Sequence, residues 1–424
     1  MAMKKQTKPV QTFDVLVLGA GIVGVSTAIY LRRFGLDVAL IDRKHPGEEA
    51  SFGNAGIIQR NGFVPPSMSP GLGTLLSTAL GHSTAVQYSL PALIGLLPWL
   101  RRYFRASSGA AAEAYCRAVA PLRALAVETH LELASSTNAD RYYRRGGWLH
   151  LYRSGNSYRA SEAERYYARI YGVSYDELSP GDLGLLEPGL KLKDLPTIHW
   201  PETRSVSNPG AVVDAFWRGF IQDGGAYFRA DALKVQQQRG GWAVAGERAS
   251  VFGRHAVVAL GAWSTDFLKM QGETYPLAAK RGYHMHYRPK SGASLSRPVV
   301  DIDNGFVLTP TDNGIRLTTG VELASRDAPA NPAIIKHVKR KAEELFPLGR
   351  ALQDAPWMGS RPCLPDSLPI VGASQKTRGL WFNFGHGHDG FTLGPVTGKL
   401  LAELITNKPS SADLAPFSPL RFFS

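Results

Sequence analysis

The chain has 424 residues, of which 44% are hydrophobic and 20% are charged, and its formal net charge is +13. This length and balance predict a globular protein with a full core and two domains, and they exclude a disordered chain. The two cysteines, Cys116 and Cys363, lie far apart in the sequence, which excludes a disulfide scaffold and favours a reducing cytoplasm. The basic N-terminus has no apolar segment before the first expected strand, so we expect no signal peptide.

An apolar run, residues 13–18, leads directly into the glycine-rich sequence GAGIVG, residues 19–24. This pattern predicts a strand, a tight glycine turn and a helix whose free N–H groups bind a diphosphate. A second apolar run, 38–41, ends in Asp42, whose carboxylate is expected to accept hydrogen bonds from an adenosine ribose. Because a carboxylate there would repel a ribose phosphate, the motif favours NAD or FAD over NADP.

The segment 89–105 is apolar at its start and basic at its end. It is interrupted by Pro91, Gly95 and Pro98, and its apolar part is too short to cross a bilayer. Two interpretations stay open: a core helix with a solvated basic end, or a peripheral contact with the inner face of the cytoplasmic membrane.

The middle of the chain alternates helical and strand patterns. Helices are expected over 110–134 and over 209–223, the second opened by Asn208 with a proline in its first turn. The expected strands cover residues 142–152, 228–237, 241–245, 249–259 and 280–287. We place strand 249–259 beside the first strand, with Gly261 and Ala262 near the dinucleotide, because ligands collect at the carboxyl ends of such strands.

The C-terminal sequence NFGHGHDGFTLGP, residues 383–395, precedes an apolar helix that is expected to have Pro395 in its first turn. Glycine lets backbone N–H groups approach a planar ligand, and a helix N-terminus adds partial positive charge. This arrangement favours a flavin, whose reduced form is negatively charged near its N1–C2=O edge. We therefore predict FAD. His386 and His388 lie in this loop without enough further ligands nearby, so we expect no metal.

Taken together, these motifs resemble the D-amino acid oxidase superfamily of flavoproteins, and within it the bacterial D-amino acid dehydrogenases. The motifs are 19–24 with Asp42, SFGNAG at 51–56, GAWS at 261–264, RPCLPD at 361–366, and 385–392. The resemblance implies a fold of the α/β and α+β classes, in which a Rossmann-like FAD-binding domain is interleaved with an antiparallel-sheet substrate domain. The expected segments are 11–90, 200–275 and 355–410 for the FAD-binding domain, and 91–199 and 276–354 for the substrate domain.

The resemblance and the motifs together give the expected FAD-binding residues. They are Gly19, Gly21, Ile22, Val23, Gly24, Asp42, Arg43, Ser51, Asn54, Ala55, Gly56, Ile57, Val235, Gly261, Trp263, Gly387, His388, Gly390, Phe391 and Thr392. Val235 is expected on a strand that contacts adenine. Some relatives attach flavin covalently through a cysteine just before the position of Arg361, but this chain has Gly359 and Ser360 there, so we expect noncovalent FAD.

The resemblance also implies the chemistry. Arg361 would anchor the substrate carboxylate, because a planar guanidinium pairs with two oxygens at once. Hydride transfer from Cα to flavin N5 would then give an imine, which water hydrolyses to a 2-oxo acid and ammonia. On strand 280–287, either Tyr283 could bind the carboxylate or His284 could adjust the protonation of the amine, and core packing is an equal alternative for both.

Several alternatives stay open for function. The substrate is expected to be a small D-amino acid, with D-proline, D-hydroxyproline, glycine or sarcosine as alternatives. Gly56 and Gln59 stand where sarcosine-oxidase-type relatives carry basic residues, which favours D-amino acids, whereas Asp389 could face substrate and favour a secondary amine. The expected electron acceptor is a quinone or the respiratory chain, and nucleic acid is not expected as a partner. A non-catalytic flavoprotein subunit and a tRNA-modifying flavin domain are the other classes.

Overall fold

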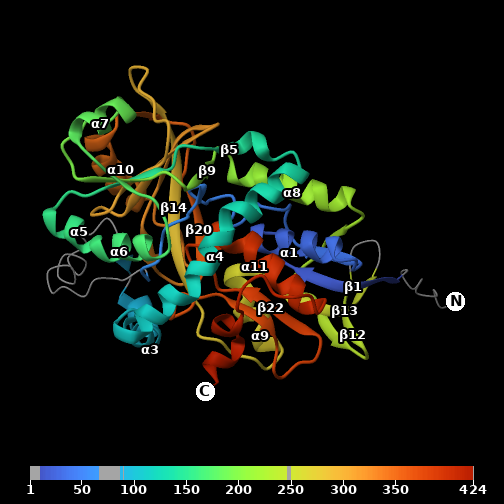
Figure 1. Ribbon diagram of the computed structural model, residues 1–424. Helices are drawn as coiled ribbons and strands as arrows, with labels where there is room; N and C mark the ends of the chain where they lie inside the picture. Colours follow the sequence, from blue (N-terminus) through green and yellow to red (C-terminus); the bar gives the residue numbers. More distant parts are fainter. Residues whose placement is uncertain (1–9, 66–85, 89, 246–249, 424) are drawn as a thin grey trace.

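The computed structural model describes residues 10–65, 86–88, 90–245 and 250–423 of the chain. Its framework is two large β-sheets, one of eight strands and one of eleven, with helices packed around them (Figure 1). Each large sheet takes strands from several separate stretches of the chain. This architecture confirms the predicted fold class.

The eight-stranded sheet has a parallel centre. Its strands are β1 (Val10–Leu18), β2 (Val38–Asp42), β10 (Ala226–Arg229), β11 (Gln236–Gln238), β12 (Gly241–Ala245), β13 (Ser250–Val258), β21 (Ile370–Ala373) and β22 (Leu380–Phe384). They follow the order β10-β2-β1-β13-β12-β11, with β22 beside β13 and β21 beside β22. Strand β13 pairs with β1 in parallel, as the sequence predicted. Residues 15–18 of β1 are fully buried, because helices cover both faces of the sheet.

Helices α1 (Ile22–Arg33), α8 (Pro209–Gln222) and α11 (Gly390–Ile405) contribute to the apolar cluster that contains Val15 and Val17 of β1. Leu16 and Leu18 point to the other face, where they share a cluster with Phe267 of α9 (Ser264–Met270). Helices α1 and α11 approach closely, since a Cβ atom at Gly398 would lie 2.8 Å from the backbone nitrogen of Thr27. Helix α4 (Gly109–Ser136) packs against α11 (Figure 1).

The eleven-stranded sheet is centred on β14. Its strands are β4 (Val86–Tyr88), β6 (Trp148–Leu151), β7 (Asp176–Leu178), β8 (Thr197–Trp200), β14 (Ala278–Pro289), β15 (Val299–Asp301), β16 (Phe306–Thr311), β17 (Gly314–Thr318), β18 (Val321–Leu323), β19 (Leu348–Ala351) and β20 (Trp357–Cys363). The order is β4-β18-β14-β17-β16-β15-β6-β8-β7, and β19 and β20 also pair with β14. Tyr283, Met285 and Tyr287 of β14 pack together with helix α10 (Ala333–Leu345), which confirms the predicted alternation.

The remaining elements are short. A third sheet contains β3 (Ile57–Ile58), β5 (Tyr143–Arg144) and β9 (Arg204–Val206). The other helices are α3 (Leu90–Ala106), α5 (Gly155–Ala160), α6 (Glu162–Ile170) and α7 (Pro180–Leu186), with 3-10 helices η1 (Asp140–Tyr142), η2 (Ala232–Lys234), η3 (Gly261–Trp263), η4 (Ala415–Phe417) and η5 (Pro419–Phe422). The domain bounds stay a prediction. Residues 66–85 and 89 of the first predicted segment lie outside the described residues, and β4 and β20 pair within the eleven-stranded sheet.

Helix α3 has a buried aromatic side and an exposed side that carries apolar and basic residues, in line with the two interpretations of its sequence. Trp99 and Tyr103 are buried, whereas Ile94 and Leu97 are 68% and 56% exposed. Three arginines near its end, Arg101, Arg102 and Arg105, are also exposed. Within the described residues, none of the helices has the length and apolar character needed to cross a membrane. Contact with a membrane surface stays a prediction, which co-sedimentation with anionic vesicles would test.

The predicted start of the last helix was wrong. Helix α11 begins at Gly390, and Pro395 lies inside it rather than in its first turn. Proline has no N–H group, so the carbonyl group of Phe391, four residues earlier, has no helical donor. His130 of α4 supplies the missing donor, with its Nε2 atom 2.7 Å from the Phe391 oxygen. The sequence pattern could not show a donor that comes from 261 residues away.

Candidate functional site

The turn between β1 and α1 has the geometry that its glycines predict. Gly19 has φ +105°, and a Cβ atom there would lie 2.4 Å from the Ala259 oxygen. At Gly24 a Cβ atom would lie 1.8 Å from the oxygen of Gly19, so the strand and helix can pack only without a side chain. Gly21 is less crowded and lines a cavity. These roles are the ones that a dinucleotide-binding turn requires.

Two side chains hold this turn in place. The Ser51 hydroxyl oxygen accepts a hydrogen bond from the Ile22 N–H group at 2.9 Å, at the start of α1, which has no side-chain cap of its own. The two carboxylate oxygens of Asp42 accept hydrogen bonds from the N–H groups of Ala20 at 2.7 Å and Lys44 at 2.9 Å. Each oxygen keeps lone pairs for a further donor, such as a ribose hydroxyl.

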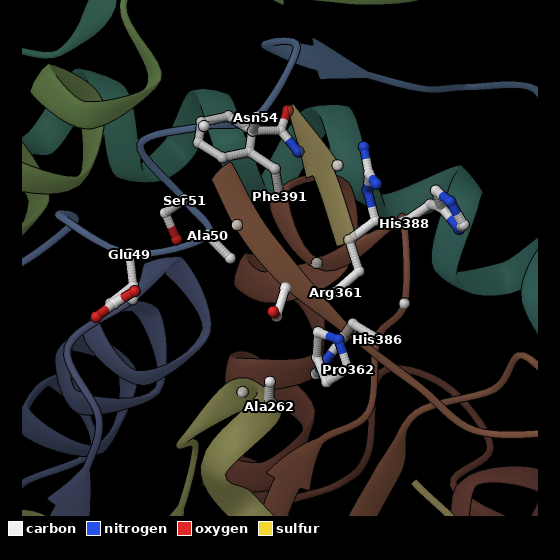
Figure 2. Close-up of a pocket in the computed structure, with 18 of the residues that line it drawn as sticks. Glu49, Ala50, Ser51, Asn54, Ala262, Arg361, Pro362, His386, His388 and Phe391 are labelled. Atoms are coloured by element: carbon white, nitrogen blue, oxygen red, sulfur yellow. The ribbon is translucent and has the colours of Figure 1, made fainter. Parts of the chain in front are cut away.

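A continuous cavity of about 450 Å³ extends from this turn to the eleven-stranded sheet. Figure 2 shows that residues from separate parts of the chain surround it, among them Ser51, Ala262, Arg361 and Phe391. The predicted cofactor residues that line it are Gly19, Gly21, Ile22, Val23, Asp42, Arg43, Ser51, Asn54, Ala55, Ile57, Gly261, Trp263, Gly387, His388, Gly390, Phe391 and Thr392. The structure thus brings together residues that lie more than 300 positions apart in the sequence.

Three predicted cofactor residues do not line the cavity. Gly24 packs beneath the turn, and Gly56 forms a turn of its own, where a Cβ atom would lie 2.6 Å from the Val206 oxygen. Val235 is not on a strand: it follows η2 and is buried in an apolar cluster. Ala232 and Leu233 line the cavity in its place. The error at Val235 arose because sequence alternation does not register a 3-10 turn before a short strand.

Arg361 reaches the cavity from β20. Its cross-strand partner on β14 is Lys280. The guanidinium lies over Gly282, two residues further along β14, where a Cβ atom would lie 2.1 Å from Nη1, so the missing side chain makes room for it. The guanidinium has a single long contact, 3.4 Å from Nη1 to the Gly320 oxygen. No carboxylate among the described residues pairs with it. Burial lowers its pKa, but an arginine remains charged at neutral pH.

His388 lies beside Arg361 on the cavity wall (Figure 2). The residue as a whole is exposed, although nearby protein atoms still reduce the hydration of its ring. Burial, together with the positive charges of Arg361 and Lys280, holds the pKa of His388 well below its usual value. The imidazole is therefore neutral at physiological pH, and one of its nitrogens can accept a hydrogen bond.

Comparison with known proteins identifies the family to which the chain belongs. A sequence model of the FAD dependent oxidoreductase family, DAO, matches residues 14–404. The chain belongs to this family. It is 32% identical over 423 residues to a D-amino-acid oxidase of Bradyrhizobium diazoefficiens, covering 96% of this chain and 98% of the relative. It is 28% identical over 434 residues to a D-amino acid dehydrogenase of Granulibacter bethesdensis, covering 96% and 99%.

Solved structures show the same fold. Glycine oxidase from Geobacillus kaustophilus matches with a TM-score of 0.72 at 22% identity, covering 96% of this chain and 98% of that one. This likeness shows a shared fold. Membership of the family confirms the resemblance seen in the sequence and makes FAD the cofactor of this oxidoreductase.

The cavity of this FAD-dependent oxidoreductase fits the cofactor at both ends. The part of the cavity lined by Gly21 and Ile22 lies at the N-terminus of α1, where backbone N–H groups favour a diphosphate. The N-terminus of α11 also lines the cavity, through Gly390, Phe391 and Thr392. The Thr392 hydroxyl donates to the Ile57 oxygen at 3.1 Å, which joins α11 to the segment after Ser51. Dinucleotide and isoalloxazine contacts of individual residues stay predictions.

Tyr283 and His284 lie on opposite faces of β14, in different surroundings. The Tyr283 hydroxyl points to the far face of the sheet, where it donates to Glu322 at 2.7 Å and accepts from Arg281 at 2.9 Å. His284 is fully buried and does not line the cavity, because Phe52 and a stacked Trp357 ring lie against it. Tyr283 lines the cavity, but its hydroxyl group is held by Glu322 and Arg281. A role of either residue in binding substrate stays a prediction. Strand alternation identified the two faces, but not the loop and the ring that cover one of them.

Replacing His284 with phenylalanine is expected to leave kcat/KM within about threefold, because the imidazole touches no ligand. Burial lowers the pKa of His284 to about 2, so the folded protein takes up no proton there as the pH falls below 6.5. The unfolded chain does take one up, and stability therefore decreases with falling pH. Between pH 7 and pH 5, the unfolding free energy of the variant is expected to fall by about 2 kcal/mol less than that of the unmodified protein.

Urea titrations at both pH values, with steady-state rates, measure these effects. His45, an exposed histidine on the surface, provides the matched control as His45→Phe. A large fall in kcat for His284→Phe with unchanged stability would restore the catalytic interpretation.

Asp389 and His386 have structural partners. Asp389 is buried and forms an ion pair with Arg123, Nη2 to Oδ2 2.8 Å, and it does not line the cavity. The suggestion that Asp389 selects a secondary amine is therefore wrong. His386 lies 2.9 Å from the Thr397 hydroxyl. Among the described residues, no group of three or more histidine, cysteine, aspartate or glutamate side chains could hold a metal ion.

The sequence did not reveal the aromatic and aliphatic wall of the cavity. The Trp357 ring fills the space that side chains at Gly53 and Gly359 would need, with added Cβ atoms 1.7 and 2.1 Å from it. Val300 and Val307 face the cavity from neighbouring strands, as does Trp148. Gly53 lies in the 51–56 motif and Gly359 on β20, and their shared contact with Trp357 appears only when β20 packs against the 51–56 loop.

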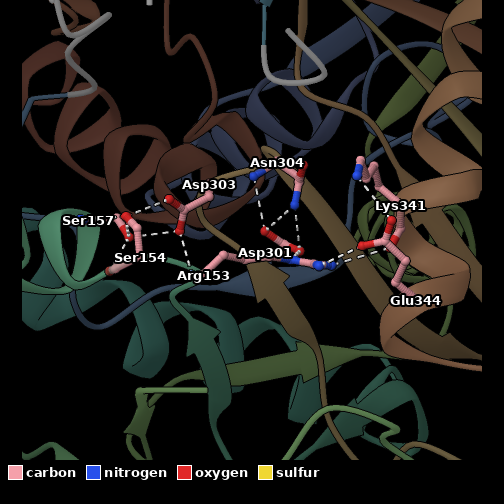
Figure 3. Close-up of polar contacts among 8 residues, drawn as sticks. All are labelled: Arg153, Ser154, Ser157, Asp301, Asp303, Asn304, Lys341 and Glu344. Atoms are coloured by element: carbon pink, nitrogen blue, oxygen red, sulfur yellow. Dashed lines mark hydrogen bonds and ion pairs between the residues drawn. The ribbon is translucent and has the colours of Figure 1, made fainter. Parts of the chain in front are cut away.

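A polar network at the edge of the cavity, to which Asp301 belongs, fixes the turn after β15 (Figure 3). Arg153 donates from Nε to the buried Asp301 carboxylate at 2.7 Å and from Nη1 to Glu344 at 2.7 Å. Its backbone N–H group donates to Asp303 at 2.7 Å. Ile302, between the two aspartates, lines the cavity. The network therefore holds an apolar side chain at the cavity wall from behind.

Proposed function

We propose that this oxidoreductase dehydrogenates D-amino acids at the bond between Cα and the amino nitrogen. The imine that forms is hydrolysed by water to a 2-oxo acid and ammonia. The observation that carries the proposal is the Arg361 guanidinium, which lies in the FAD cavity without a carboxylate partner among the described residues. A buried positive charge needs a negatively charged partner, and a substrate carboxylate supplies one.

The side chains around Arg361 suit this substrate. Its planar fork fixes the carboxylate and thereby the direction of the Cα–H bond. The neutral His388 ring beside it can accept a hydrogen bond from the substrate ammonium or amine and adds no positive charge that would repel it. Bound FAD supplies the hydride acceptor. Trp357, Val300 and Ile302 offer an apolar wall to the substrate side chain, which favours neutral side chains over charged ones.

One observation supports the D configuration, and a second favours a primary amine over an N-methyl amine. The relatives at 32% and 28% identity carry the names D-amino-acid oxidase and D-amino acid dehydrogenase. Residues Gly56 and Gln59 provide no basic group, unlike the corresponding stretch of sarcosine-oxidase-type relatives. Glycine, sarcosine and cyclic imino acids are the alternatives that the experiment must separate.

Anaerobic reduction of the purified holoprotein tests the proposal. The visible flavin band is followed after addition of D- and L-alanine, D-leucine, D-proline, D-hydroxyproline, glycine and sarcosine. We expect D-amino acids with apolar side chains to bleach the band fastest and the L-enantiomers to have no effect. Bleaching by the L-enantiomers, or by none of these compounds, would overturn the proposal.

We further propose a quinone of the respiratory chain as electron acceptor. The exposed apolar and basic face of α3 would bring the protein to the membrane in which such acceptors reside. Turnover of the best substrate is compared with oxygen and with a soluble quinone. Fast oxygen consumption without a benefit from the quinone would identify an oxidase instead.

A further inference from the structure

Helix α4 contacts the N-terminus of α11 at two polar points. The residues concerned on α4 are Arg123 and His130, which lie seven positions apart and so face the same side of the helix. Their partners are Asp389, which immediately precedes α11, and Phe391 in its first turn. Phe391 lines the FAD cavity. These contacts therefore connect α4 to the part of α11 that faces the cofactor.

The first contact is a buried ion pair. Nη2 of Arg123 lies 2.8 Å from Oδ2 of Asp389, and the two side chains are 2% and 12% exposed. The Nε and Nη1 atoms of Arg123 are buried and have no hydrogen-bond partner among the residues that the structure describes, so Asp389 is the main compensation for this charge, with smaller contributions from Tyr115 and Glu164. Burial alone would lower the pKa of Arg123, but the attraction of Asp389 outweighs it and raises that pKa. At Gly62, a Cβ atom would lie 2.8 Å from Nη2, which shows how tightly the guanidinium is packed.

The second contact replaces a missing backbone bond. Burial lowers the pKa of His130 to about 4, so the ring is neutral at physiological pH. The Tyr143 hydroxyl, whose pKa burial raises well above 10, lies 2.9 Å from Nδ1 and donates to it. The proton of His130 is therefore on Nε2, which donates to the Phe391 oxygen at 2.7 Å. This is the carbonyl group that Pro395 leaves without a donor.

We propose that Arg123 and Asp389 are a positioning pair that sets the electrostatic potential at the cofactor-facing end of α11, and that His130 fixes the direction of this end. A helix N-terminus presents partial positive charge to its surroundings. An unpaired carboxylate at Asp389 would cancel that charge, and Arg123 prevents the cancellation. Because reduction adds negative charge to bound FAD, the balance of the pair should shift its reduction potential. The inference depends on FAD binding and not on the identity of the substrate.

Opposite charge changes test the pair. Asp389→Asn leaves the cation, and Arg123→Gln leaves the anion, whereas the double variant removes both. At a fixed solution potential we expect the ratio of reduced to oxidised flavin to rise about tenfold in Asp389→Asn and to fall about tenfold in Arg123→Gln. Tenfold corresponds to about 30 mV for this two-electron couple. The double variant is expected to return close to the unmodified protein. Equilibration with a reference dye measures all three without an amine substrate.

A purely structural role predicts another pattern. Both single variants would then bind FAD more weakly, with potentials unchanged or shifted in the same direction, and either result overturns the proposal. If Arg123→Gln does not fold, Arg123→Lys retains the charge and is expected to keep the potential. Asp389→Asn alone must still raise the potential; an unchanged potential there contradicts the proposal.

The role of His130 has its own rescue experiment. His130→Phe removes the donor to the Phe391 oxygen and is expected to raise the FAD dissociation constant about tenfold. Pro395→Ala restores a backbone N–H group at the position that can serve the same carbonyl group. The double variant should therefore recover most of the FAD affinity, measured by quenching of flavin fluorescence. Equal FAD affinity in His130→Phe and the double variant would show that the hydrogen bond does not orient α11.

Discussion

Replacing Arg361 with alanine is expected to lower kcat/KM for every carboxylate substrate by about a hundredfold to a thousandfold. Removing one partner of a buried charge pair costs about 2–5 kcal/mol, and about 1.4 kcal/mol corresponds to a factor of ten. The loss should appear mainly in KM where binding alone is affected, and in kcat where the Cα–H direction is lost as well. Anaerobic reduction of the variant at several substrate concentrations separates the two.

Gly282→Ala provides a second variant that keeps the charge of Arg361. Its new Cβ atom would occupy the space 2.1 Å from Nη1, so the flexible guanidinium must move while the backbone can stay. We expect a rise in KM of about tenfold with a melting temperature close to that of the unmodified protein. An amine that lacks a carboxylate is the control substrate and should be equally poor for all three proteins. Unchanged reduction by D-amino acids in Arg361→Ala would remove this residue from the site.

The second large effect is expected for Gly24→Ala, which should yield a protein that does not retain FAD. The added Cβ atom would lie 1.8 Å from the Gly19 oxygen, and backbone atoms cannot move aside without opening the turn. Overpacking of this kind typically costs about 1–3 kcal/mol of stability. Here it also displaces the N–H groups of α1 that face the cavity. The ratio of visible to ultraviolet absorbance after purification measures the FAD content, and thermal unfolding with and without added FAD measures the coupling.

Gly95→Ala is the matched control for this substitution. Gly95 lies inside α3, and a Cβ atom there meets nothing within 4 Å. Alanine is favoured over glycine in a helix by about 0.5–1 kcal/mol, so this variant should be as stable as the unmodified protein or slightly more stable, and fully yellow. Normal FAD content in Gly24→Ala would show that the dinucleotide turn tolerates a side chain and would contradict the geometry described above.

Much of the fold was predictable because its patterns are local. The helix 209–223 has an Asn208 cap and a proline in its first turn, and α8 begins at Pro209 as predicted. Strand 280–287 alternates regularly, and β14 places Tyr283, Met285 and Tyr287 in one cluster. The dinucleotide turn needed only three glycines and Asp42 at a fixed spacing. In each case the residues that determine the structure are close neighbours in the sequence.

The misinterpreted residues share the opposite property. Asp389 and Pro395 could not be understood without α4, because Arg123 and His130 are their partners. His284 seemed available for chemistry until Trp357 and the 51–56 loop were seen to cover it. Such contacts join segments separated by tens or hundreds of residues, and no local pattern specifies which of them meet.

The sequence by itself predicted a dinucleotide, NAD or FAD rather than NADP, and its glycine-rich C-terminal loop favoured a flavin. The dinucleotide prediction rests on backbone conformation and charge, which a few adjacent residues define, whereas Arg361 as the anchor of a carboxylate came from the resemblance to a known family. Only the tertiary structure decided that no carboxylate of the described residues pairs with Arg361, that Trp357 forms part of the cavity wall, and that α4 holds the N-terminus of α11. The physical reason is that burial and the pairing of charges depend on which distant segments pack together, and only the folded chain brings them into contact.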